Sequence, residues 1–464
     1  MGWAIKVAIF LVGGTLLLDQ LEAFAFMDAF PISPNKAFTV VLLGLAAMNW
    51  IVAGGKIPGN RKSKWLIAFY FSLAVSSGHA AVQGVGFTWI MLRWTTLISM
   101  LLFYYLLLYV LRDRKTLDLF LFSMMVSGVI ATASAFLLEG SGGYYGPVRR
   151  SGLGSGENQA AGNLLMLLPF VFALTHRRPS LFQKTTLVGI AVVFVVGFAV
   201  ALSRSAFLAA LAMGAMWGLR MRRLSDLRVV AAGLVFVVIA YLVAPEGYAS
   251  RLESLVNIFQ STRTAYTDEI GYRASIYQAG FIAFVENPVI GVGLEQFVDW
   301  AGRRDASMIG VHEIHNAVLK VAANQGLLGV VPYLALLLVT FLDFSRVQVV
   351  ARAYRHLQDY ELDQLYVRAL TAQVGFVGIL VVGMFQPGTF WRGIWALFAI
   401  STVLIELTRQ RLNELGVGQS APQPELFERS DDPTRPGPAG PATFGGNSDS
   451  PLGEAPSPSR GFQT

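Results

Sequence analysis

Apolar residues in this chain gather into long runs instead of alternating with polar ones. Most runs have about 17 to 25 residues, the length at which a helix crosses a bilayer with its backbone hydrogen bonds satisfied internally. The pattern predicts an all-α polytopic membrane protein with about 12 transmembrane helices. The predicted spans are residues 3–18, 37–53, 65–80, 88–111, 117–138, 158–175, 185–201, 205–219, 229–244, 317–342, 365–385 and 391–407.

Basic residues mark every second connection between these runs, whereas the alternate connections are acidic or nearly uncharged. Loops rich in Lys and Arg are retained in the cytoplasm during membrane insertion. We therefore expect a multi-pass protein of the bacterial inner (plasma) membrane with both termini in the cytoplasm. The basic connections are residues 56–64, 112–115, 177–184, 220–228 and 346–355.

The same alternation divides the chain into four parts. Residues 1–244 hold the predicted transmembrane helices 1–9, and residues 317–410 hold helices 10–12. Between them, residues 245–316 form a large helical loop on the periplasmic side, where we expect the catalytic residues. Residues 416–464 are rich in Pro, Gly and Ser, which predicts a disordered cytoplasmic tail.

Composition agrees with a membrane environment and narrows the chemistry. The chain is 54% hydrophobic and 14% charged, with a mean hydropathy of +0.54, so it has too little polar surface for a soluble globule of this length. The net charge of +7 lies mostly in the predicted cytoplasmic connections and therefore reflects topology, not nucleic-acid binding. The absence of Cys excludes disulfides, thiolate nucleophiles and thiolate metal sites.

Two helices are predicted in the periplasmic loop. Apolar residues at helical spacing in 248–259 indicate an amphipathic helix on the membrane surface or an ordinary packed helix. A second helix is expected to begin near Arg273 and to end at Asn287 and Pro288, before a glycine turn. A cation at a helix start opposes the helix dipole, so this placement of Arg273 hints at a ligand.

His315 and Asn316 are expected at the outer mouth of the tenth span. A histidine side chain has an unperturbed pKa of about 6.5, so it is largely neutral at pH 7 and can accept a proton. His315 is therefore a candidate general base. The alternative is a structural histidine beside Asn316 as the helix N-cap. His312 lies one turn earlier, but two histidines without a third ligand are a weak metal signal.

Arginines are expected to create a positive cavity at the outer membrane boundary. A guanidinium stays charged and offers forked donors to phosphate oxygens, so the cavity suits a diphosphate. For Arg204, the alternative is that its side chain reaches lipid phosphates. The nearest approach to a paired acidic metal site on this side is Asp268 with Glu269, so no metal or cofactor is expected. The candidate arginines are Arg93, Arg149, Arg150, Arg204, Arg273 and Arg392.

The order of these features resembles the bacterial O-antigen ligase and Wzy-type polymerase superfamily. The matching features are a span opening with SR, a long outer loop carrying an arginine, ENPVIGVG, and HN before the glycines of QGLLG. The stretch GSGENQAAGNLLMLLP also resembles the segment that precedes a mid-chain span in that superfamily. The resemblance covers residues 152–332.

The resemblance implies a GT-C-like membrane glycosyltransferase. Such an enzyme moves a preassembled glycan from undecaprenyl diphosphate to an acceptor hydroxyl on the periplasmic side. Arg204 and Arg273 then match arginines that hold the carrier diphosphate, and His315 matches an essential histidine; Asn316, Arg93, Arg149 and Arg150 are further candidates for substrate binding. Because the donor carries its own leaving group, arginines can neutralise the departing charge without a metal.

The sequence leaves the acceptor open. An O-antigen ligase transfers the glycan to lipid A core, a polymerase to another carrier-linked repeat unit, and some relatives to protein hydroxyls. A secondary transporter of the same superfamily is the non-enzymatic alternative, but transporters place ionisable residues at mid-bilayer in interrupted helices. Here the spans look almost wholly apolar, which favours chemistry at the outer rim.

Overall fold

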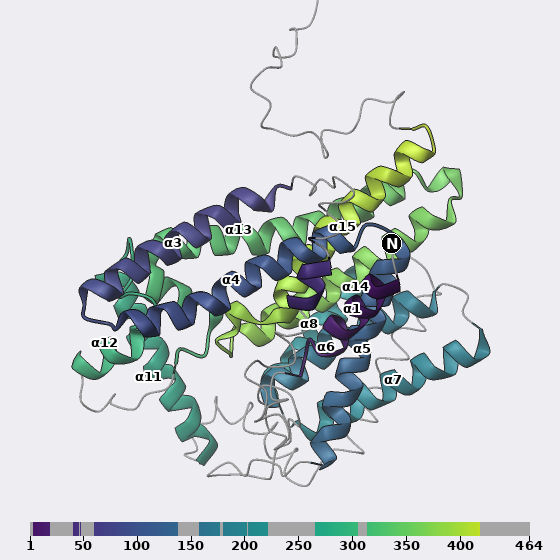
Figure 1. The fold of residues 1–464 in the computed structure, drawn as a ribbon. Helices are drawn as coiled ribbons and strands as arrows, with labels where there is room; N and C mark the ends of the chain where they lie inside the picture. The colour runs from purple at the N-terminus through teal and green to yellow at the C-terminus, as the bar shows by residue number, and fades with distance from the viewer. Residues whose placement is uncertain are drawn as a thin grey trace, which may run out of the picture. The chain divides into compact units, whose positions relative to one another are not determined.

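The computed structural model is all-helical over the residues that it describes, and Figure 1 shows the helices packed side by side. The described residues are 3–18, 40–45, 47, 60–137, 157–176, 180–201, 203–220, 265–304 and 313–417. The α-helices are α1 (Trp3–Gly14), α3 (Lys62–Val82), α4 (Phe87–Val110), α5 (Arg114–Leu137), α6 (Glu157–Thr175), α7 (Leu181–Val200), α8 (Arg204–Arg220), α11 (Ala265–Glu286), α12 (Phe297–Arg304), α13 (Ala317–Ala353), α14 (Tyr360–Gly383) and α15 (Arg392–Glu414). Short 3-10 helices, η5 (Arg355–Leu357) and η6 (Gly388–Phe390), flank α14.

Seven of the described helices are long and apolar enough to cross a membrane, namely α3, α4, α5, α6, α7, α13 and α14. This supports a polytopic membrane protein. Helix α1 is apolar but has 12 residues, and α8 has 17. The expected total of about 12 spans stays a prediction, because long stretches of the predicted spans 37–53 and 229–244 lie outside the described residues.

Two predicted boundaries are wrong. Residues 346–355 were expected to form a connection, but α13 continues to Ala353 and η5 follows. The second helix of the periplasmic loop was expected to begin near Arg273, yet α11 already begins at Ala265. In α13, charged and polar residues that tolerate a helix continue the one that apolar residues begin, and no Gly or Pro at the predicted boundary stops it. In α11, the polar residues before Arg273 form the first turns, and the helix continues through Gly271.

Several other predictions fall outside the part of the chain that the structure describes. They concern the ninth span, the surface helix at 248–259, Arg149, Arg150, His312 and the tail from residue 418 onward.

The helices alternate in direction as the basic connections predict. Lys62 at the start of α3 pairs with Asp343 far along α13, and Arg114 at the start of α5 pairs with Glu361 at the start of α14. We call this side of the bundle the basic end. The opposite side, where α13 begins, is the His315 end. Which of the two faces the cytoplasm stays a prediction.

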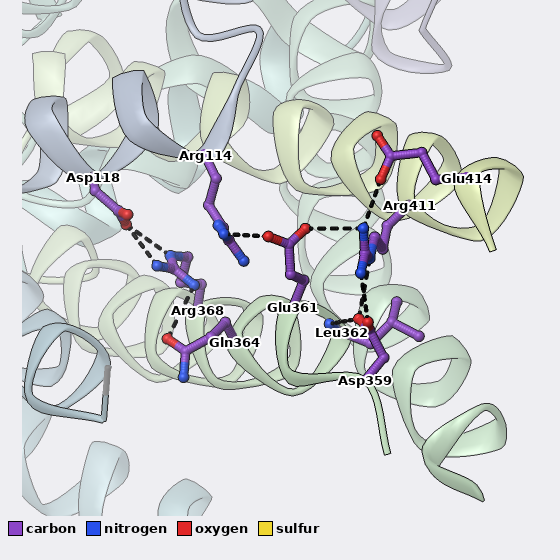
Figure 2. Close-up of polar contacts among 9 residues, drawn as sticks. All are labelled: Arg114, Asp118, Asp359, Glu361, Leu362, Gln364, Arg368, Arg411 and Glu414. Atoms are coloured by element: carbon purple, nitrogen blue, oxygen red, sulfur yellow. Dashed lines mark hydrogen bonds and ion pairs between the residues drawn. The ribbon is translucent and has the colours of Figure 1, made fainter. Parts of the chain in front are cut away.

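Ion pairs tie three helices together at the basic end (Figure 2). Arg411 of α15 contacts Asp359 at 2.6 Å and Glu361 at 3.4 Å, and Arg114 of α5 pairs with the same glutamate. The Asp359 carboxylate also accepts the backbone N–H of Leu362 at 2.8 Å and so caps α14. The cluster fixes the ends of α5, α14 and α15 relative to one another.

Two ion pairs near the basic end are buried, and the first of them lies within predicted spans that were expected to be almost wholly apolar. Arg368 of α14 contacts Asp118 of α5 at 2.8 Å, and both side chains are buried (Figure 2). Lys62 and Asp343 form the second buried pair, and Thr402 accepts a hydrogen bond from the Lys62 ammonium at 3.0 Å. A buried charge is tolerated when it is paired and hydrogen-bonded, so these groups join helices near the basic end.

Helix α13 is broken at Gly326, where the backbone angles are φ 61° and ψ −155°. The break frees carbonyls that an intact helix would use. The carbonyl of Ala323 accepts the N–H of Val292 at 2.9 Å, and that of Asn324 accepts the N–H of Gly293 at 3.1 Å. Both donors lie in the turn at residues 287–296 that follows α11, so this turn completes the hydrogen bonding of the broken helix.

The exchange is reciprocal on the other side of the break. Leu327 donates its N–H to the carbonyl of Pro288 at 2.7 Å, and Leu328 donates to Val289 at 3.1 Å. Two glycines permit this close approach. A Cβ on Gly291 would lie 2.3 Å from the Gln325 nitrogen, and one on Gly326 would lie 2.4 Å from the carbonyl carbon of Val289.

Helix α3 secures the same junction from a third direction. Ser76 donates its hydroxyl to the Asn324 carbonyl at 2.7 Å, while its own carbonyl accepts the N–H of Leu294 at 3.2 Å. The side chain of Asn324 accepts the N–H of Phe297, the first residue of α12, at 3.2 Å. The first part of α13, the turn and α3 therefore form one unit at the His315 end.

We predict that Gly326→Ala destabilises this junction by more than about 3 kcal/mol, since the alanine would need a glycine-only conformation and its Cβ would overlap the Val289 carbonyl. Gly214→Ala in α8 is the matched control, because a Cβ there meets nothing within 4 Å. Thermal unfolding of the two purified variants checks the prediction. Equal midpoints for both would contradict it.

Candidate functional site

Four charged side chains form a chain of ion pairs at the His315 end. Arg93, in the second turn of α4, contacts Glu295 at 2.9 Å. Glu295 lies 3.6 Å from Lys320, the fourth residue of α13, and Lys320 contacts Glu313 at 2.8 Å. Opposite charges alternate along the chain, so its formal charges cancel. This charge chain links α4, the 287–296 turn, α13 and the segment that precedes α13.

Glu295 occupies a conformation that its residue type disfavours. Its φ is 51°, in the left-handed region that glycine adopts without cost. The carboxylate is 15% exposed and holds Arg93 and Lys320 from opposite sides. The two ion pairs and the fixed backbone of the turn keep the residue in this conformation.

His315 is held through both its ring and its backbone. The ring Nδ1 lies 2.7 Å from the carbonyl oxygen of Glu313. The carbonyl of His315 accepts the hydroxyl of Tyr277, on α11, at 2.7 Å. These contacts hold the imidazole between α11 and the charge chain.

Asn316 has a structural role in this geometry. Its side-chain oxygen accepts the N–H of Leu319 at 3.0 Å, which makes it the N-cap of α13. The cap was the structural alternative in the sequence analysis, and the structure provides it. The carbonyl of Ala317, the next residue, accepts the hydroxyl of Thr389 at 3.4 Å. Contact with η6 therefore also fixes the start of α13.

Arg273 does not stand at a helix start. It lies in the third turn of α11, so the argument from the helix dipole does not apply to it. Tyr277 follows one turn later in α11 and interacts electrostatically with Arg273. Burial raises the pKa of the Tyr277 hydroxyl, and the positive charge of Arg273 acts in the opposite direction. Arg273 is therefore close to the tyrosine whose hydroxyl contacts His315.

The Glu313 carboxylate is ionised at neutral pH. Burial is the largest single effect and would raise its pKa, but the charge and hydrogen bond of Lys320 together with smaller contributions from Arg93 and His315 outweigh it. The pKa of Glu313 is therefore held below its usual range. The interactions of Glu313 with Arg93 and His315 place both residues in the same electrostatic neighbourhood.

Arg204 lies at the same end of the bundle, on a different helix. Helix α8 runs antiparallel to α14, because Arg220 donates to Gln348 at the basic end while Met213 packs against Gly378. Arg204 is two and a half turns from Met213, about 13 Å along the helix axis. Only five residues, about 8 Å, separate Gly378 from the end of α14 at Gly383, so Arg204 lies on the His315 side of that helix end. Tyr277 approaches the carbonyl of the next residue, Met384, at 3.4 Å.

The remaining candidate arginines are Arg392, Arg149 and Arg150. Arg392 begins α15, directly after η6, and so also lies at the His315 end. A further histidine, His79 near the end of α3, contacts the amide of Gln83 one turn later at 2.8 Å. Arg149 and Arg150 precede α6 and lie outside the described residues, so no geometry tests their predicted roles.

Sequence reasoning missed Glu295, Lys320, Glu313 and Tyr277. It named only Asp268 and Glu269 as an acidic pair on this side, whereas the structure brings two other carboxylates around one lysine. A signal existed for Lys320, because a cation in the first turn of a span opposes the helix dipole as Arg273 was thought to do. Carboxylates from the same loop thus neutralise part of the positive charge that was expected at this end.

Residues 189–334 match the family model Wzy_C, which is described as O-antigen ligase. The match runs from α7 into α13 and contains Arg204, Arg273 and His315, while Arg93 precedes it. It covers about a third of the chain and confirms the superfamily resemblance predicted from the sequence. No curated protein matches this chain.

We predict that Glu295→Ala is less stable than Glu295→Gly by about 1 kcal/mol, because both remove the carboxylate but only alanine retains the cost of a left-handed φ. Both variants should be less stable than the natural protein, since Arg93 and Lys320 lose their shared anion. Chemical or thermal unfolding in one detergent provides the comparison. An alanine variant as stable as the glycine variant would show that the backbone of this turn relaxes.

Proposed function

Because residues 189–334 match the O-antigen ligase family, we propose that this protein is a membrane glycosyltransferase that acts on a lipid-linked glycan. Its donor is a preassembled glycan on undecaprenyl diphosphate, and its acceptor is a hydroxyl on the periplasmic side. The observation that carries the proposal is the grouping of Arg273, Tyr277 and His315. Tyr277 lies within the electrostatic reach of Arg273 and donates its hydroxyl to the carbonyl of His315.

The proposed reaction uses these groups in distinct roles. Arg273 and Arg204 bind the diphosphate, whose charge grows as the bond from the anomeric carbon to the phosphate oxygen breaks. The acceptor oxygen forms the new bond to that carbon from the opposite side, so the configuration inverts. The hydroxyl proton passes to the imidazole of His315, and the electron pair of the broken bond leaves with the carrier diphosphate.

Arg93 has a different place in the proposal. It is paired with Glu295 and stacks over Trp89 with 5.1 Å between the guanidinium carbon and the ring centroid. A guanidinium already neutralised by a carboxylate binds a phosphate less strongly than one with net charge to offer. We therefore propose that Arg93 mainly supports the charge chain and contributes less to binding the donor.

Three acceptors fit the proposed chemistry. In a ligase the acceptor is lipid A core, and in a polymerase it is the non-carrier end of a second lipid-linked repeat unit. A protein hydroxyl, as in an O-oligosaccharyltransferase, is the third candidate. Mixing the purified protein with carrier-linked glycan and each acceptor in turn, then identifying the product by mass, distinguishes them.

The transporter alternative draws support from the break in α13, because transporters bind substrates where helices are interrupted. In this chain, however, the carbonyls of Ala323 and Asn324 and the N–H groups of Leu327 and Leu328 are all used by the 287–296 turn and α3. The buried ion pairs lie toward the basic end, and each charged group in them is already paired with a group of opposite charge. Neither feature offers binding groups at mid-bilayer, so we favour the transferase.

We predict that His315→Ala and Arg273→Ala each lower glycan transfer by about 100-fold or more, since one removes the proton acceptor and the other a diphosphate ligand. Transfer to the acceptor is measured in reconstituted membranes, beside the amount of folded protein. Arg304→Met is the matched control, because Arg304 is an exposed arginine of the same loop that pairs with Glu286 and stacks over Trp300. Full activity in both site variants would remove the enzyme assignment.

Arg204→Lys tests whether the guanidinium fork matters. The substitution retains the charge but loses the paired N–H donors that match two phosphate oxygens. We expect the KM for the donor to rise by about tenfold, with the protein still folded. A wild-type KM would instead favour simple contact between Arg204 and membrane phospholipid.

A further inference from the structure

The hydrogen bond of the His315 ring determines which of its two nitrogens carries the hydrogen in the neutral imidazole. A carbonyl oxygen only accepts hydrogen bonds, so the Nδ1 that lies 2.7 Å from the Glu313 carbonyl must carry the hydrogen. In the neutral imidazole the lone pair then resides on Nε2. The proposed proton acceptor is therefore Nε2, provided that the Glu313 carbonyl stays in place.

Side chains at both ends of the segment 313–316 fix that carbonyl. This segment precedes α13 and has no regular secondary structure of its own. At its start, the Glu313 carboxylate contacts Lys320 at 2.8 Å; at its end, the Asn316 side chain caps the first turn of α13. Both anchors lie on the first turn of the helix, so the segment closes a small loop around His315.

Lys320 is itself held in place. Its side chain is 11% exposed and lies between Glu313 and Glu295, and Glu295 is fixed by Arg93. An ammonium shared between two carboxylates has no net charge to offer a diphosphate. This arrangement favours a role in placing the histidine over a role in binding the donor.

We propose that Lys320 is a positioning residue for His315: by anchoring Glu313 it holds the carbonyl that keeps Nδ1 protonated and Nε2 available. The inference rests on the proposed transferase function and deepens it. The charged and titratable groups linked to the segment that carries the imidazole include Glu313 before α13, Lys320 on α13, Glu295 in the 287–296 turn, Arg93 on α4, and Arg273 with Tyr277 on α11.

The kinetic test uses Lys320→Met, which retains the length of the side chain and removes its charge. We expect kcat to fall by about 10- to 100-fold, because the base is misplaced, while the KM for the donor is unchanged. Lys320→Arg should restore most of kcat, and the Arg304→Met control should match the wild type. A wild-type kcat in Lys320→Met, or a raised donor KM at constant kcat, would overturn the inference.

Glu313→Gln provides an independent variant should Lys320→Met fail to fold. Glutamine retains an oxygen that accepts a hydrogen bond from Lys320 but loses the ion pair. We expect the same pattern, a lower kcat at an unchanged donor KM, to a smaller extent. Wild-type kinetics in this variant would show that the ion pair does not position His315.

A spectroscopic readout separates this inference from the proposed function. The chain has five histidines, so 15N-histidine labelling with a His315→Asn variant for assignment isolates one ring. The Nδ1–H tautomer should dominate in the wild type, and both tautomers should appear in Lys320→Met. If the wild-type protein transfers no glycan, the transferase proposal is wrong. If the wild type and Lys320→Met show the same tautomer of His315, the proposed role of Lys320 is wrong.

Discussion

Backbone hydrogen bonds between the 287–296 turn and the break in α13 form the framework that carries the charge chain at the His315 end. A helix interrupted inside an apolar bundle would leave carbonyls and N–H groups without partners, at a cost of several kcal/mol. The turn satisfies those groups and is bound by them in return. This mutual exchange fixes the first part of α13, and with it Asn316 and Lys320, while it places Glu295 beside them.

Charge serves different purposes at the two ends of the bundle. At the basic end, Arg368 with Asp118 and Lys62 with Asp343 are buried pairs that join helices. At the His315 end, the pairs form a chain that is partly exposed and stands next to an imidazole. Buried pairs lock a structure because breaking them leaves an unpaired charge. The charge chain, in contrast, orients a segment that carries the proposed base.

The proposed chemistry depends on loop residues supported by rigid elements. His315 lies in an irregular segment, yet Tyr277 of α11 holds its carbonyl and Glu313 holds its ring. Small displacements of a general base lower its efficiency steeply, so such anchoring suits catalysis. The segment matched by the O-antigen ligase family contains all of these residues, from the arginine on α8 to the lysine on α13.

Local patterns in the sequence were enough to predict the apolar spans of α3 to α7, the helix stop at Asn287 and the glycine turn, because each depends on neighbouring residues. The cap at Asn316 was foreseen only as the alternative to a role in substrate binding. The charge chain could not be predicted in this way. Arg93 and Glu295 are far apart in the chain, and they meet only because the turn docks into a broken helix beside α4. Ion pairs between distant segments follow from packing geometry, which hydrophobic periodicity does not encode.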